Sequence, residues 1–172
     1  MTQTTTKYKR KPWFNIYKPL KKEGAGAALQ FSYDATKLGI YLEASRQKGG
    51  KLAIGSKDQF DWANKIVFKL GTADVGQLLL LFAGRKKEIK LIHQPRDGAH
   101  TSVLEITKQT GQYDNYSLKL SKTVKGNDGN TTNGVNIYVD HHEMALLAHF
   151  MRESLTRMFG FDAPEPQEQQ ES

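Results

Sequence analysis

The sequence predicts an α+β fold with antiparallel sheets, built from two consecutive units that each place several strands before one helix. Three observations lead to this prediction. Apolar and polar residues alternate with a period of two in many short segments. The period lengthens to three or four residues near positions 72–83 and 141–158, as a helix requires. Turns rich in Gly, Asn and Asp separate the strand-like segments.

The first unit is predicted to begin with strands and to close with a helix. Its clearest strand is 65–70, where three apolar residues share one face and two lysines lie on the other. A helix over 72–83 follows, with Thr72 as its N-cap, Asp74 in its first turn and Gly84 at its end. The other strand-like segments are 13–17, 29–34, 38–43 and, after a Gly-Gly turn, 52–54.

The second unit repeats this order without repeating the sequence. Its predicted strands are 88–94, 102–108, 116–122 and 135–139. A helix over 141–158 follows them, and its apolar face is unusually wide, which indicates burial on more than one side. The residues of that face are Met144, Leu146, Leu147, Phe150, Met151, Leu155 and Met158.

Charge is divided unevenly along the 172 residues, which hold 25 Lys and Arg against 18 Asp and Glu. The first 22 positions contain seven basic residues and no acid, whereas residues 162–172 contain four acids and no base. Without that acidic segment the chain has a net charge of +11. We therefore predict a basic flexible arm over 1–11, a structured domain over 12–161 and an acidic disordered tail over 162–172.

Several classes of protein are excluded. The chain has no cysteine, so it contains no disulfides, thiol nucleophiles, thiolate zinc sites or iron–sulfur clusters. Its longest apolar run is far short of the ~20 residues that cross a bilayer, and its first residues lack the apolar core of a secretory signal. A soluble protein is expected.

Catalytic and cofactor motifs are not found. The string His141-His142-Glu143 suggests a metal site, but adjacent helical positions point about 100° apart and no second His follows at i+4. We interpret Asp140 as the helix N-cap, with Glu143 in the first turn. The string Gly24-Ala25-Gly26 does not continue into a G-x-G-x-x-G fingerprint. We expect no enzyme, no cofactor and no metal site.

Binding chemistry is better represented, because the predicted strands interleave aromatic residues with lysines. Proteins that bind single-stranded nucleic acid use this mixture, since cations neutralise phosphates and aromatic faces stack on bases. Reading a duplex would require a helix with Arg, Asn or Gln along one face, which neither predicted helix provides. The alternative is that the aromatic residues belong to the core and the lysines to solvated faces.

Several strings, taken in order, resemble the Whirly family of single-stranded DNA-binding proteins. Phe60-Asp61-Trp62 leads into Val67-Phe68-Lys69-Leu70 and then into Asp74-Val75-Gly76, as in the segment of that family that enters its first helix. Ile92-His93-Gln94-Pro95 and the closing Met158-Phe159-Gly160-Phe161-Asp162 are similar to two later stretches of the family. The resemblance runs from about Tyr17 to Asp162.

This resemblance implies two four-stranded antiparallel sheets packed crosswise, each followed by a helix. It also implies a homotetramer with the helices at its centre, and single-stranded DNA lying across the sheets, in grooves between neighbouring subunits, largely without sequence preference. The chain departs from the family at one string. Gly24-Ala25-Gly26-Ala27-Ala28-Leu29 stands where the family has Lys-Gly-Lys-Ala-Ala-Leu, so both lysines are missing and assembly beyond a tetramer is not expected.

We therefore expect residues 12–161 to form a Whirly-like domain that binds single-stranded DNA without catalysis and protects it in replication, recombination or repair. One alternative is an RNA-binding or annealing protein or a transcription regulator with the same fold; another is a protein-interaction module whose charge is incidental. The candidate contact residues are Trp13, Tyr17, Lys18, Phe31, Tyr41, Lys51, Lys65, Lys69, Lys90, Lys119 and Lys122.

The acidic tail and the cellular setting follow as further expectations. The tail is either a solvating terminus, a competitor for the basic groove or a segment that binds replication or repair proteins. We expect a bacterial or viral gene product, nucleoid-associated in a cytoplasm, with a mitochondrion or plastid as the alternative setting.

Overall fold

The computed structural model describes residues 12–50, 58–112 and 114–161, and these form two four-stranded antiparallel sheets. The first sheet contains β1 (Trp13–Lys18), β2 (Ala27–Asp34), β3 (Gly39–Arg46) and β4 (Ile66–Leu70), with a short 3-10 helix η1 (Trp62–Asn64) before β4. The second contains β5 (Glu88–His93), β6 (His100–Lys108), β7 (Tyr116–Gly126) and β8 (Gly129–Val139). Helix α1 (Thr72–Phe82) follows the first sheet and α2 (His141–Met158) follows the second, so the predicted fold class is confirmed.

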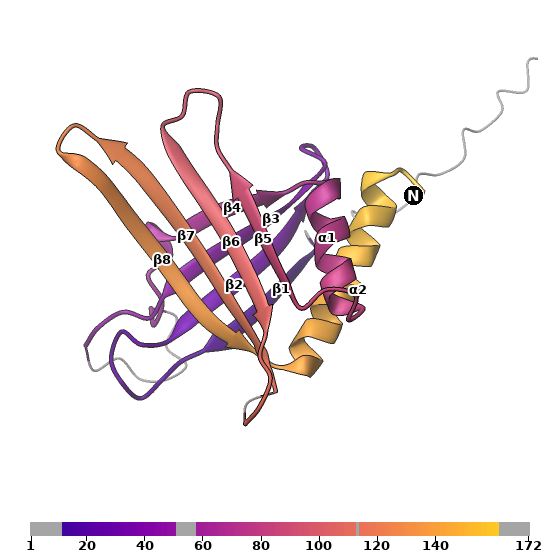
Figure 1. The fold of residues 1–172 in the computed structure, drawn as a ribbon, viewed down its shortest axis with the longest axis horizontal. Coiled ribbons are helices and arrows are strands. Elements are labelled where there is room, and N and C mark those ends of the chain that lie inside the picture. The colour runs from indigo at the N-terminus through magenta and orange to yellow at the C-terminus, as the bar shows by residue number, and fades with distance from the viewer. Residues whose placement is uncertain (1–11, 51–57, 113, 162–172) are drawn as a thin grey trace, which may run out of the picture.

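The two sheets pack face to face with their strands crossing, and both helices lie side by side at one end of the sheets (Figure 1). In each sheet, every second side chain along a strand points inward, and these side chains form one core. The core includes Phe31, Leu42 and Phe68 from the first sheet and Leu104 and Leu118 from the second. One face of each sheet is therefore buried and the other faces solvent.

The helix ends follow from local capping. The backbone N–H of Gly71 donates to the Asp74 carboxylate at 2.9 Å, so the N-cap of α1 is Gly71 and the prediction of Thr72 was wrong by one residue. Gly84 follows α1 with φ +71, the left-handed conformation that ends helices. In α2 the N–H of Asp140 donates to Glu143 at 2.9 Å, which confirms the capping role predicted for this pair.

The hairpin of β7 and β8 is longer than the sequence predicts. Its ladder continues past the apolar residues to the pair Gly126 and Gly129, which leaves a two-residue turn at Asn127 and Asp128. The added part consists of Thr, Lys, Asn and Gly residues and Val124, most of them exposed, and it extends beyond the core at the end opposite the helices (Figure 1).

Three predictions lie outside the described residues: the arm over 1–11, the tail over 162–172 and the strand over 52–54. Neither described helix has the length and hydropathy of a membrane-spanning segment.

Within α2, Leu147 and Met151 are buried, but Leu146 on the widened apolar face is 56% exposed.

Candidate nucleic-acid interface

The outer face of the first sheet carries most of the exposed aromatic residues of the strands. The buried side chains Ile16, Phe31, Leu42 and Phe68 define the inner face, so their sequence neighbours point outward. We call the outward-facing set the aromatic face; it consists of Trp13, Asn15, Tyr17, Gln30, Ser32, Tyr41, Glu43, Val67 and Lys69.

One row of cross-strand neighbours crosses this face from edge to edge. Trp13 pairs with Ser32, Ser32 with Tyr41 and Tyr41 with Lys69. Trp13 is 60% exposed, whereas the small Ser32 between the two aromatic side chains is only 8% exposed. The row therefore presents two aromatic side chains that are separated by one strand, with a cation on the strand next to Tyr41; neighbouring strands lie about 4.8 Å apart.

A second aromatic group lies further along β1. The ring of Tyr17 is 49% exposed and its centroid is 5.8 Å from that of Phe60, which in turn lies 6.5 Å from Trp62. Asn15 donates a hydrogen bond of 2.7 Å to the Tyr17 hydroxyl, which fixes the orientation of the phenol. Tyr17 is thus held on one side while much of the side chain remains accessible.

Cations gather at one corner of the aromatic face. The Lys37 ammonium lies 5.7 Å from the centroid of the Tyr41 ring, within the range of a cation–π contact. Lys69 donates to the backbone carbonyl of Lys37 at 3.3 Å, which brings both ammonium-bearing residues beside Tyr41. Lys65, just before β4, instead pairs with Glu43 at 2.8 Å, so its charge is compensated. Lys37 was not in the candidate set, although its position four residues before Tyr41, across a turn, was a usable signal.

The outer face of the second sheet carries a carboxylate between two lysines. Lys90 pairs with Glu105 at 2.7 Å, and Lys119 lies opposite Glu105 in the β6–β7 ladder. The hydrogen bond from Lys90 holds the pKa of Glu105 below its ordinary value, so this carboxylate stays charged and offsets one lysine. The structure thus places Lys90 and Lys119 together, but away from the aromatic face.

The remaining candidates do not join either group. The prediction of Phe31 as a contact residue was wrong, because its side chain is 1% exposed and packs in the core. Lys18 and Lys122 have the opposite strand parity from the outer faces, so neither points toward the residues grouped above. Lys51 lies outside the described residues.

Lys18 instead connects the first sheet to α2. Its ammonium lies 2.7 Å from the Asp140 carboxylate and 2.8 Å from that of Glu143. Burial lowers the pKa of Lys18, but hydrogen bonds and charges from these two carboxylates outweigh it, so the pKa is raised above its ordinary value. Asp140, His142 and Glu143 place potential metal-ligating atoms within 4.8 Å of one another, but the Lys18 ammonium already compensates both carboxylates.

His93 has a similar structural role at the other helix. Its ring stacks on Phe68 with a centroid distance of 4.2 Å, and Nε2 lies 3.1 Å from the Asp74 carboxylate that caps α1. The contact joins the end of β5 to the start of α1.

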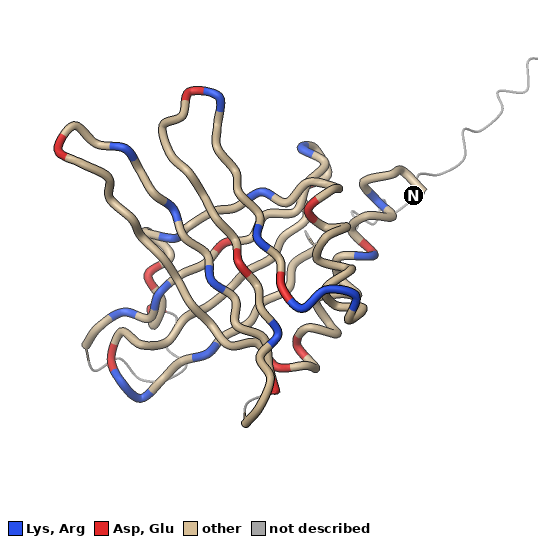
Figure 2. The backbone as a smooth tube through the Cα atoms, in the orientation of Figure 1, with Lys and Arg blue, Asp and Glu red and all other residues tan. Residues whose placement is uncertain are grey.

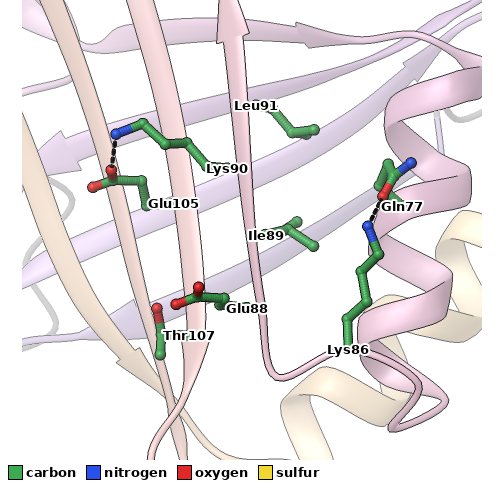
Figure 3. Close-up of a pocket in the computed structure, with 8 residues that line it drawn as sticks. All are labelled: Gln77, Lys86, Glu88, Ile89, Lys90, Leu91, Glu105 and Thr107. Carbon is green, nitrogen blue, oxygen red and sulfur yellow. Dashed lines mark hydrogen bonds and ion pairs between the residues drawn. The ribbon is translucent and has the colours of Figure 1, made fainter.

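A pocket of about 720 Å³ lies between β5 and α1 (Figure 3). Figure 3 shows the Lys90 ammonium bonded to Glu105 and the Lys86 ammonium bonded to Gln77, so both cations of the pocket are engaged by neighbouring side chains.

Fold and surface together define a class: α+β proteins with two crossed four-stranded sheets whose outer faces, rather than their helices, present aromatic and basic side chains. Lys and Arg lie mainly along the strands and in the connecting loops (Figure 2), while α1 contains no basic residue and α2 contains Arg152 and Arg157. This arrangement is suited to binding a polyanion along a sheet.

Residues 21–150 match the family model described as "Whirly transcription factor", so the chain belongs to the Whirly family. No curated protein sequence matches the chain.

Solved structures of low sequence identity share the fold. WHY3 from Arabidopsis thaliana has a TM-score of 0.66 at 20% identity, with 88% of this chain and 90% of that chain covered. MRP1/MRP2 of Trypanosoma brucei has a TM-score of 0.63 at 16% identity, with 89% of each chain covered. A guide RNA-binding protein complex bound to a guide RNA has a TM-score of 0.62 at 18% identity, covering 89% of this chain and 95% of that one.

Proposed function

We propose that this protein binds single-stranded DNA across the aromatic face, largely without sequence preference and without catalysis, and protects it during replication, recombination or repair. The observation that carries the proposal is the exposure of Trp13 and Tyr17 on the same face as Tyr41 and Lys69. Every base has an aromatic face that can stack on such side chains, whereas in a duplex the bases are stacked on each other and are not available.

The phosphate contribution comes from lysines that remain available. Lys21, Lys22, Lys37 and Lys69 make no ion pair with another described residue. If these four neutralise about four phosphates of a single strand, a fourfold increase in salt is expected to weaken binding by about 50-fold.

The deciding experiment is a gel-shift titration of the full chain with a single strand of about 30 nucleotides and with the corresponding duplex. We expect tighter binding to the single strand and a steep loss of affinity with salt. Equal or tighter binding to the duplex would contradict the proposal.

RNA is the second candidate ligand. It is favoured by the structural similarity to a complex described as bound to a guide RNA, and by the fact that stacking does not distinguish the two sugars. Competition between RNA and DNA strands of equal length separates the two ligands: preferential displacement of DNA by RNA would support an RNA-binding, annealing or regulatory function.

We further propose that the chain assembles through its helices into a homotetramer. Leu80 of α1 is 43% exposed and Leu146 of α2 is 56% exposed, so each helix presents apolar surface that contact with another copy of the chain would bury. A Leu146→Glu substitution is expected to lower the mass measured by light scattering from that of a tetramer toward that of a monomer. An unchanged mass would place the interface elsewhere.

A further inference from the structure

The second sheet ends at β5, and the outer edge of this strand lies along a groove. Within the described chain β5 pairs only with β6, because the strand order is β5-β6-β7-β8. The pocket of about 720 Å³ runs beside this edge, and four consecutive residues of β5, 88–91, line it. Gln77 of α1 and Lys86 just after α1 stand on the other side, joined by a hydrogen bond (Figure 3). A strand edge and a helix therefore form the two walls of the groove.

The edge of β5 presents backbone groups that have no backbone partner in the described chain. In an antiparallel ladder, only alternate residues turn their N–H and C=O groups toward the neighbouring strand. The Lys108 N–H donates to the Lys87 carbonyl at 2.8 Å, which sets this alternation for the β5–β6 ladder. The backbone groups of Glu88, Lys90 and Ile92 therefore point away from β6. Such an edge can pair with a further extended chain.

Both ends of the groove are held in place. At one end the Arg85 N–H donates to the Leu80 carbonyl at 2.9 Å, which closes the turn from α1 into β5. At the other end His93 Nε2 lies 3.1 Å from the Asp74 carboxylate, which ties the last residue of β5 to the first turn of α1. A groove that is already formed lowers the cost of ordering a bound segment.

The groove is bordered by more cations than anions. Three consecutive cations, Arg85, Lys86 and Lys87, stand between α1 and β5. Lys86 bonds to a neutral amide, and neither Arg85 nor Lys87 makes an ion pair with another described residue. The groove lining includes two acids, one of which, Glu105, is paired with Lys90. The positive balance of charge is complementary to an acidic partner.

A peptide suits this groove better than a nucleic acid. None of the described residues that line it is aromatic, so bases would have no ring on which to stack. Unpaired N–H and C=O groups along a strand edge are instead complementary to another polypeptide backbone. Ile89 and Leu91 lie on the α1 side of β5 and Lys90 on the other side (Figure 3), so alternate side chains of an added strand meet apolar and basic surroundings.

We propose that this groove binds an extended acidic peptide of a partner protein, which adds to β5 as a fifth strand of the second sheet. The backbone groups of Glu88, Lys90 and Ile92 pair with the peptide backbone. The cations of residues 85–87 contact its acidic side chains. The groove and the aromatic face belong to different sheets, so a partner protein and a single strand of nucleic acid can be held at the same time.

The first test is fluorescence anisotropy of the full chain with a labelled peptide of about nine residues in which Glu and Val alternate. A second peptide of the same sequence carries N-methyl groups at its central residues, which removes backbone donors on both edges and leaves the charge unchanged. We expect saturable binding of the first peptide and at least about tenfold weaker binding of the second. Equal binding of the two, or no binding of the first, overturns the proposal.

The second test changes β5 itself. Lys90→Pro removes an N–H that takes no part in the β5–β6 ladder, and an edge strand tolerates proline at such a position. We expect Lys90→Pro to weaken peptide binding at least about tenfold, and Lys90→Ala, which retains the N–H and loses only the charge, about threefold. Lys125→Ala removes a lysine far along β7 and is expected to leave binding unchanged.

Equal binding by Lys90→Pro and Lys90→Ala overturns strand addition, and circular dichroism checks that both variants are folded. If Lys90→Pro does not fold, the comparison of the two peptides decides alone. Peptide binding is also measured with the chain saturated by a single-stranded oligonucleotide, and we expect it to persist. Displacement of the peptide would assign the groove to nucleic acid and overturn the proposal, while the proposed function would stand.

Discussion

A Trp13→Ala, Tyr17→Ala double variant is expected to bind single-stranded DNA about 100-fold more weakly than the unchanged chain. Each base stacked on an aromatic side chain contributes about 1–3 kcal/mol, so losing two such contacts near the lower end of that range gives this factor. Both side chains are about half exposed or more, so their removal costs the core little. Anisotropy titration with a single-stranded oligonucleotide measures the change.

Phe161→Ala provides the control for general loss of exposed aromatic surface. Phe161 is 80% exposed, lies beyond the end of α2 and is not part of the aromatic face. We expect this variant to retain the affinity of the unchanged chain. If both variants bind equally well, the aromatic face does not stack on bases.

Gly26→Lys is expected to destabilise the fold by about 3 kcal/mol, because position 26 has no space for a side chain. A Cβ there would lie 2.1 Å from Gln47 Oε1, 2.6 Å from the Lys18 carbonyl oxygen and 2.9 Å from the Leu20 nitrogen. Two of these atoms belong to the backbone, so moving Gln47 does not relieve the clash. Urea denaturation followed by circular dichroism measures the loss.

Gly49→Ala is the matched control, since a Cβ at Gly49 meets nothing within 4 Å and its φ is not positive. We expect nearly unchanged stability for this variant. Position 26 lies in the string where the family has Lys-Gly-Lys-Ala-Ala-Leu, so Gly26→Lys also introduces one of the two lysines that this chain lacks. The Gln47 side chain accepts from the backbone N–H groups of Leu20 and Gly26 and donates to the Leu20 carbonyl. A Gly26→Lys chain as stable as the unchanged protein would show that the loop can open, and that these hydrogen bonds do not fix it.

The sequence could predict most of the fold because apolar alternation and capping residues are local signals. Ile66, Phe68 and Leu70 alternate with solvent-facing residues and are all buried, as predicted. The Asp140–Glu143 capping pair can be read from the sequence, and in the structure α2 begins directly after Asp140.

Other parts depend on contacts that local sequence does not encode. The polar ends of β7 and β8 do not alternate between apolar and polar residues. The sequence therefore does not predict that their ladder continues to Gly126 and Gly129. Alternation also does not say which face is inward when both faces of one strand carry aromatic residues, as with Trp13 and Phe14 on β1. The pairing of Lys18 with Asp140 joins residues 122 positions apart, and only the packed chain brings them together.

The most direct test of binding through the aromatic face is the fluorescence of Trp13 in a Trp62→Phe chain. The protein contains two tryptophans, so this substitution leaves Trp13 as the single reporter. Stacking of a base on the indole is expected to quench its emission in a saturable manner as a single-stranded oligonucleotide is added, and salt is expected to reverse the change. Tight binding of the same oligonucleotide with no change in Trp13 emission would contradict binding through the aromatic face.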